Sequence, residues 1–205
     1  VAGLKTAQVA ALTTAQVAVM QTADLVKLDT AQIRALTTAQ ISALTTDVQV
    51  PALLSTQLNA MTSTQVAALS NAQATALTTL QAANLGTTQV AALTTGAIAA
   101  MDVVDVAAMS TAAVAAMSTD QIRALTTAED GQIVGLTTAQ VAGLKTAQVA
   151  ALTTAQVAAM QTADLVKLDT AQIRAMTTAQ IRALTTDLQV PALLSTQINA
   201  MTSTQ

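Results

Sequence analysis

LTTAQVAA, at residues 152–159, is the stretch that decides the fold of this 205-residue chain, because variants of it fill the sequence from one end to the other. A leucine or methionine recurs every eight residues from Leu4 to Met201, and we number each octapeptide from that anchor as place one. There are 25 anchors, 17 Leu and 8 Met, and every methionine of the chain is one of them. A short fixed period is typical of an array in which each repeat packs mainly on its neighbours.

The eight-residue period is interrupted at three points, which lie between Leu44 and Leu53, between Leu184 and Leu193, and between Leu125 and Leu136. The first two interruptions add one residue each, and the third adds three. A one-residue slip would turn the inward side chains of a β-strand outward. An array of helices joined by turns absorbs such a slip in a turn, so the interruptions favour helices.

A longer repeat lies over the short one. Residues 141–205 match residues 1–65 with only five differences, at positions 19, 36, 42, 48 and 58 of the first copy. Such near-identity indicates that a block was copied as a whole. We therefore predict a single continuous repeat array over residues 1–205, cut as a window from a longer array.

Composition excludes several classes of protein. The chain is 52% hydrophobic but has no Phe, Tyr or Trp, so its interior should be thin and filled by small side chains. It has no Cys, hence no disulfide framework and no thiol chemistry. A net charge of −3 with 9% charged residues provides no basic stripe for nucleic acid. Mean hydropathy is +0.52, yet Thr and Gln interrupt every octapeptide, and a membrane helix needs roughly 18 apolar residues in succession. We expect no membrane insertion.

Helical geometry requires each octapeptide to start a new helix. Eight residues advance an α-helix by about 800°, so the anchors of one long helix would drift by roughly 80° per octapeptide and form no stripe. The sequence offers a restart signal at residues 117–122. There Ser118 can act as N-cap, Gln121 can reach back to it as in a capping box, and Met117 with Ile122 can form a hydrophobic staple.

The predicted fold class is therefore all-α: a solenoid, or superhelix, of very short capped helices, one per eight-residue unit. A β-solenoid is the alternative, since Thr and Val favour strands and places one, three and five alternate. Places four and seven vary most and are expected to face solvent. The near-invariant Thr at place three stays open: Thr6 or Thr14 can itself be the cap, or can hydrogen-bond to the next octapeptide.

Two pairs of acidic residues are candidates for calcium: Asp102 with Asp105, and Glu129 with Asp130. Neither pair has the glycine-punctuated loop of a calcium site, so we interpret them as first-turn or solvated acids. The pairs Asp24–Lys27 and Asp164–Lys167 have the i,i+3 spacing of local ion pairs on a helix.

Ser and Thr are abundant, but the chain has no His or Cys to activate a hydroxyl nucleophile. The sequence accordingly predicts no enzyme, no catalytic residue, no cofactor-binding residue and no metal ligand.

Strings such as Leu136-Thr137-Thr138-Ala139-Gln140-Val141 resemble the octapeptide-repeat tracts of very long bacterial surface or secreted proteins. The resemblance extends over the whole chain and implies an extracellular or cell-surface location in bacteria. The opening LTxxQ is also similar to helix starts in TAL-effector repeats. Those repeats have a 34-residue period and a base-reading loop, which this acidic chain lacks, so DNA is not expected as a partner.

Two functional hypotheses follow. The first is a structural extracellular fibre or filament segment that associates with copies of itself and performs no catalysis. The second is a repetitive binding array, either an adhesin stalk or a surface of Thr rows that binds ice, polysaccharide or another cell.

Overall fold

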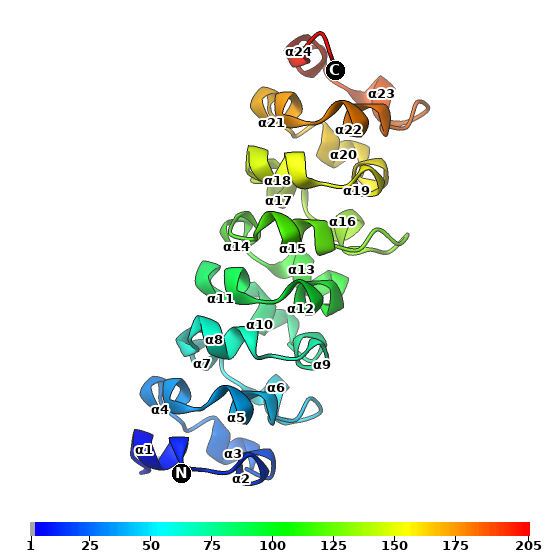
Figure 1. Cartoon of the computed structure of the whole chain (residues 1–205). Helices are drawn as coiled ribbons and strands as arrows, with labels where there is room; N and C mark the ends of the chain where they lie inside the picture. Colours follow the sequence, from blue (N-terminus) through cyan, green and yellow to red (C-terminus); the bar gives the residue numbers. More distant parts are fainter. Residues whose placement is uncertain (1–2) are drawn as a thin grey trace. The chain divides into compact units, whose positions relative to one another are not determined.

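The structure, a computed structural model, describes residues 3–205 and is built from 24 short helices in that range, with no strand there (Figure 1). The expected all-α class is confirmed, and the β-solenoid alternative is wrong. Each octapeptide from Leu4 to Leu193 contributes one helix. The chain divides into two compact units, Val1–Met109 and Ser110–Gln205, which we call the N-terminal and C-terminal units.

All the helices of residues 3–205 have four to six residues. Those of the N-terminal unit are α1 (Thr6–Ala10), α2 (Thr14–Ala18), α3 (Thr22–Leu25), α4 (Thr30–Ala35), α5 (Thr38–Ser42), α6 (Gln49–Ala52), α7 (Ser55–Ala60), α8 (Ser63–Ala67), α9 (Asn71–Thr75), α10 (Thr79–Ala83), α11 (Thr87–Ala92), α12 (Thr95–Ala100) and α13 (Val103–Ala108). Those of the C-terminal unit are α14 (Thr111–Ala115), α15 (Thr119–Ala124), α16 (Gln132–Gly135), α17 (Thr138–Ala142), α18 (Thr146–Ala151), α19 (Thr154–Ala159), α20 (Thr162–Leu165), α21 (Thr170–Ala175), α22 (Thr178–Arg182), α23 (Gln189–Ala192) and α24 (Ser195–Ala200).

Reciprocal caps define where the helices begin. The predicted capping box of α15 is confirmed: the Gln121 amide donates to Ser118 Oγ at 3.1 Å, and the Ser118 amide donates to Gln121 Oε1 at 2.7 Å. The cap therefore stands at place two. Thr6 and Thr14 at place three are the first helical residues of α1 and α2, so the interpretation of either as the cap is wrong.

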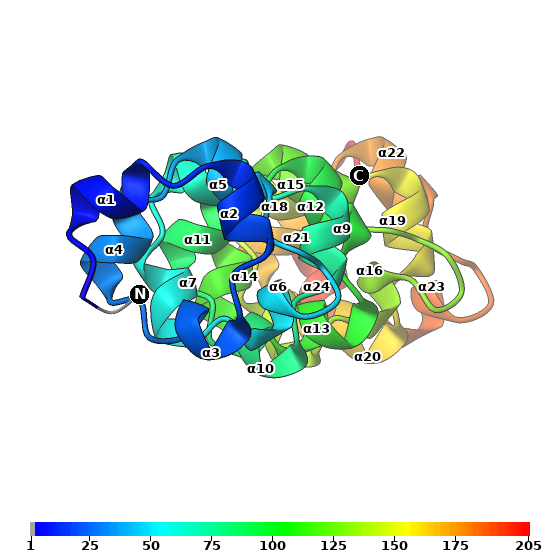
Figure 2. The same ribbon diagram turned by 90° about the horizontal axis from the view of Figure 1, so that it is seen from below.

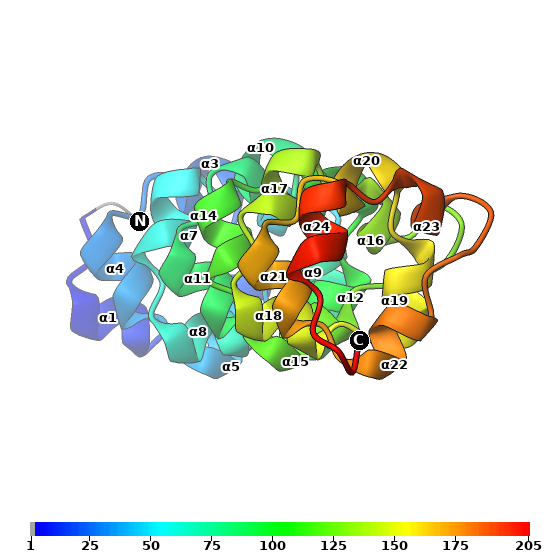
Figure 3. The same cartoon turned by 90° about the horizontal axis from the view of Figure 1, so that it is seen from above.

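Three octapeptides complete one turn of the superhelix, because helices pack against the third helix along the chain. In the N-terminal unit α1, α4, α7, α10 and α13 pack in succession, as do α2, α5, α8 and α11, while α3 packs on α6 and α9 on α12. In the C-terminal unit the series are α14, α17, α20 and α23; α15, α18, α21 and α24; and α16, α19 and α22. Figure 2 shows α1, α2 and α3 on different sides of the first turn, and Figure 3 shows the same for α22, α23 and α24.

The core consists of places one and six. From Leu28 to Leu184, every place-one side chain is at most 6% exposed. Place-six residues such as Val9, Ile33 and Val157 are fully buried. The anchors from Leu28 to Leu184 are thus buried, and the interior is narrow because its apolar side chains are only Leu, Met, Val, Ile and Ala.

The three interruptions of the period all lie between a cap and its glutamine. The Thr45 amide donates to Gln49 Oε1 at 2.9 Å across the first one-residue slip, and Thr185 does the same to Gln189 at 2.9 Å across the second. Across the three-residue insertion, the Thr126 amide still reaches Gln132 Oε1 at 3.2 Å. The extra residues form exposed turns, so the register of the core is kept.

Candidate functional site: a glutamine ladder between turns

Glutamine at place five is buried over most of both units, from Gln32 to Gln197. From Gln32 to Gln197, each place-five glutamine is at most 7% exposed, and most are at 1–3%. A buried amide that lacks hydrogen-bond partners is strongly disfavoured. The partners of these side chains therefore show what holds the array together.

Gln65 in α8 uses both ends of its amide. Its Oε1 accepts from the Thr62 backbone amide at 2.8 Å, which completes the cap of its own helix. Its Nε2 donates to the carbonyls of Ile33 at 2.8 Å and Leu36 at 2.6 Å. Those carbonyls lie at the end of α4, in the preceding turn of the superhelix, where the Ile33 carbonyl also accepts from the Leu36 amide at 3.2 Å. One side chain thus caps a helix and ties two turns together.

The same arrangement recurs along both units, and we call the place-five glutamines with these bonds the glutamine ladder. The Nε2 atoms donate to carbonyls 28–34 residues earlier in the chain. The members with this pattern, besides Gln65, are Gln32, Gln40, Gln49, Gln57, Gln73, Gln81, Gln89, Gln148, Gln156, Gln172, Gln180, Gln189, Gln197 and Gln205.

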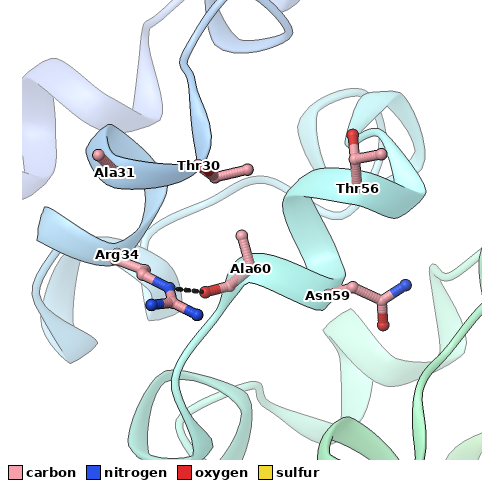
Figure 4. Close-up of a pocket in the computed structure, with 6 residues that line it drawn as sticks. All are labelled: Thr30, Ala31, Arg34, Thr56, Asn59 and Ala60. Atoms are coloured by element: carbon pink, nitrogen blue, oxygen red, sulfur yellow. Dashed lines mark hydrogen bonds between the residues drawn. The ribbon is translucent and has the colours of Figure 1, made fainter.

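Polar side chains at place seven form a second set of bonds between turns. Arg34 Nε donates to the Ala60 carbonyl at 3.0 Å, from α4 to the end of α7 (Figure 4). Equivalent donors, each reaching a place-eight carbonyl one turn later, are Ser42, Asn59, Thr75 and Arg123. All five side chains are exposed. Place seven therefore faces solvent, as expected, and in these octapeptides it also links successive turns.

An open pocket beside Arg34 is lined by Thr30, Ala31, Arg34, Thr56, Asn59 and Ala60 (Figure 4). Arg34 Nε is already bonded to Ala60. Asn59 donates to the Asn84 carbonyl at 2.7 Å and accepts from the Gly86 amide at 2.8 Å. The polar groups at this pocket therefore serve mainly to join neighbouring turns.

The candidate calcium residues do not come together as a metal site. Asp105 is 2% exposed and accepts a hydrogen bond from Thr79 Oγ1 at 2.7 Å, whereas Asp102, Glu129 and Asp130 are exposed. Burial raises the pKa of Asp105, the bond from Thr79 opposes this, and the charge of Asp102 adds to it. Within residues 3–205, no group of three or more His, Cys, Asp or Glu side chains is placed to hold a metal ion.

The predicted ion pairs are not formed. In the described part of the chain, the ion pair that the geometry supports is Asp120–Arg123, at 3.7 Å between two exposed side chains. Asp164 stands at place five, where the side chain turns inward toward the preceding turn, and it is 2% exposed while Lys167 is exposed. The predictions of an Asp24–Lys27 ion pair and of an Asp164–Lys167 ion pair are therefore wrong.

The ladder itself was missed by the sequence reasoning, which assigned glutamine only to the cap. The sequence signal that could have revealed the ladder is glutamine at place five in octapeptides whose place-two side chain has no hydrogen-bond acceptor. Lys5 and Leu54 occupy place two without a hydroxyl or carboxylate, yet Gln8 and Gln57 follow them at place five. A capping box alone does not account for those glutamines.

None of the helices in residues 3–205 is long and apolar enough to cross a membrane. The fold and the ladder together define an α-helical solenoid of octapeptide repeats, a repetitive structural protein. The chain belongs to the ALTTAQ repeat family, which matches residues 17–55, 98–129, 129–162 and 157–193, more than half of its length. This confirms the resemblance to octapeptide-repeat tracts. Comparison with curated proteins and with solved structures gives no match.

Proposed function

We propose that this chain is a segment of an extracellular structural fibre that associates with copies of itself and performs no catalysis. Residues 1–205 then act as a single continuous repeat array. The octapeptide period supports this, because it continues without interruption from Met109, the last residue of the N-terminal unit, to Met117 in the C-terminal unit. A location outside a bacterial cell or on its surface is supported by the resemblance to bacterial surface tracts and is compatible with the lack of Cys.

The observation that carries self-association is a row of exposed apolar side chains. Leu54, Leu80 and Val104 are 47%, 72% and 64% exposed. Leu54 is the N-cap residue of α7, and Leu80 and Val104 lie in α10 and α13; these three helices pack on one another in succession. Exposed apolar groups that gather on one side of a protein mark protein–protein contacts. With only 9% charged residues, little repulsion keeps copies apart.

Light scattering over a range of concentrations tests the proposal. We expect the wild-type chain to form assemblies, with interfaces above about 1,000 Å² as specific contacts require. The triple variant Leu54→Thr, Leu80→Thr, Val104→Thr should be monomeric. Threonine already occurs at the same places of other octapeptides, so the fold should be kept while the exposed apolar side chains are removed. Val19→Thr, which changes an 80% exposed valine on another helix series, is the matched control and should assemble like the wild type. A strictly monomeric wild type at high micromolar concentration would contradict self-assembly.

A second candidate, surface binding, is favoured by a row of hydroxyl groups. Thr14, Thr38, Ser63 and Thr87 are exposed and open four helices, α2, α5, α8 and α11, that pack in succession. Adsorption of the chain to ice and to insoluble polysaccharide tests this function. Binding that disappears when these four residues are changed to alanine would favour the binding array over the fibre.

A further inference from the structure

Aspartate occupies place five in three octapeptides, whereas glutamine stands there in 20 of the 25. These aspartates are Asp24, Asp105 and Asp164. Aspartate is one methylene shorter than glutamine, and its ionised carboxylate accepts hydrogen bonds but cannot donate them. The carbonyls of a preceding turn are also acceptors. An aspartate at place five therefore interrupts the glutamine ladder. Its carboxylate and the carbonyls of the preceding turn cannot hydrogen-bond to one another unless the carboxylate is protonated.

Asp164 in α20 shows this interruption most clearly. It is 2% exposed, the same as Gln172 one octapeptide later. Gln172 Nε2 donates to the carbonyls of Ala142 at 3.1 Å and Leu144 at 2.6 Å. Asp164 Oδ2, in contrast, is buried and has no hydrogen-bond partner. The carbonyl 28 residues before Asp164, in the register that joins Gln172 to Leu144, is that of Leu136.

No charged side chain compensates for the burial of this carboxylate. The helices packed on α20 are α17 and α23, and Gln161, the cap residue of α20, donates to Val134 in α16 at 3.0 Å. None of these three neighbouring helices contains an ionisable residue, and Glu129 and Asp130, before α16, are exposed. Asp187, before α23, is exposed, as are Lys167 and Asp169 on the segment that follows α20. Burial is the cause that raises the pKa of Asp164 above its ordinary value.

We propose that Asp164 is a proton-operated joint between two turns of the C-terminal unit. When Asp164 is protonated, its carboxyl O–H donates toward the Leu136 carbonyl and replaces the amide donor that glutamine provides in other octapeptides. Without the proton, acceptor faces acceptor, and α20 loosens from Leu136, which ends α16 directly before the cap residue of α17. The folded state then binds the proton more tightly than the unfolded chain. The stability from this joint is therefore fully present below pH 3.8, the ordinary pKa of aspartate, and is lost as the pH rises through the raised pKa of the folded state.

The two other aspartates provide internal comparisons. Asp24 lies in residues 21–28, whose sequence QTADLVKL is identical to residues 161–168, but its side chain is only half-buried. Asp105 is as buried as Asp164, yet Thr79 Oγ1 donates to it at 2.7 Å, so its ionised form keeps a partner. The joint at Asp164 should accordingly be the most sensitive to pH.

Two measurements test the joint on the 205-residue chain. In an NMR titration of the aspartate carboxyl carbons, Asp164 should titrate above pH 3.8, the ordinary pKa of aspartate. In hydrogen exchange, corrected for intrinsic exchange rates, amides of α17 and α20 should lose protection as the pH rises across that titration. Asp164→Gln, which restores the residue found in most octapeptides, should abolish the loss. Asp24→Asn is the matched control and should leave the pH-dependent loss of protection in α17 and α20 unchanged.

A titration midpoint of Asp164 at or below pH 3.8 would overturn the proposal. The proposal would also be overturned if the exchange protection of α17 and α20 depended on pH in the Asp164→Gln chain as it does in the wild type. If that variant is poorly folded, Asp164→Asn, which is neutral and of the same size as aspartate, replaces it and should give the same flat profile.

Discussion

Replacing Gln65 by alanine is the most direct test of the glutamine ladder. The change removes the acceptor of the Thr62 amide and the donor to the Ile33 and Leu36 carbonyls, three bonds of 2.6–2.8 Å. At about 0.5–1.5 kcal/mol net for each bond, the loss is about 2–4 kcal/mol. Since about 1.4 kcal/mol corresponds to a factor of ten, local opening should become roughly 30 to 700 times more frequent.

Thr62→Ala is the matched control, because it removes the local bonds of the Thr62 hydroxyl, which accepts from the Gln65 amide at 3.3 Å, donates to Gln65 Oε1 at 3.2 Å and bonds to Thr64 Oγ1 at 3.0 Å. Loss of a cap of this kind costs about 1 kcal/mol, and the bonds to the preceding turn remain. A stacked array does not unfold in one step, so the assay is native-state hydrogen exchange of α4 and α8 amides, the two helices that Gln65 joins, rather than a global midpoint. If Gln65→Ala lowers protection no more than Thr62→Ala, the Nε2 bonds do not hold the turns together and the ladder is refuted.

The remaining predictions concern the core and one loop. Leu93→Asp places a charge at a 4% exposed anchor, so amides of the surrounding octapeptides should lose exchange protection. Val19→Asp at an 80% exposed place eight should leave the protection around it unchanged, and equal effects would mean that place one is not the core. Gly131→Ala puts a Cβ 2.7 Å from backbone atoms of its own loop, and overpacking of this kind costs about 1–3 kcal/mol, so the exchange protection of α16 amides should fall. Gly143→Ala meets its nearest atom at 3.3 Å in a right-handed helical conformation, so a fall of equal size there would contradict the steric explanation.

Local features of the fold could be predicted because their determinants lie within one octapeptide. The capping box of Ser118 and Gln121 spans four residues, and its geometry is the same wherever a short helix begins. Burial of Met117 and Ile122 followed from the same local pattern, and both are at most 4% exposed. The restart of the helix at every octapeptide follows from the mismatch between eight residues and the helical turn.

The number of octapeptides per superhelical turn could not be predicted in this way. It depends on the angle between successive helices, which is set by packing between residues of different turns. For the same reason the second role of glutamine was missed: Gln65 meets Ile33 only after a full turn, 32 residues away. The ion pair at Asp164 failed because helical spacing alone does not tell which side chains turn inward.

The ladder has a direction, since each amide reaches back toward the N-terminus and never forward. Every carbonyl that a new glutamine needs has already been synthesised when that glutamine emerges, no more than 34 residues later. Each completed turn can therefore serve as the template for the next, and the array can grow vectorially on the ribosome without waiting for distant sequence. Such local assembly has low contact order, so a chain of this family can lengthen without its folding becoming slower per turn.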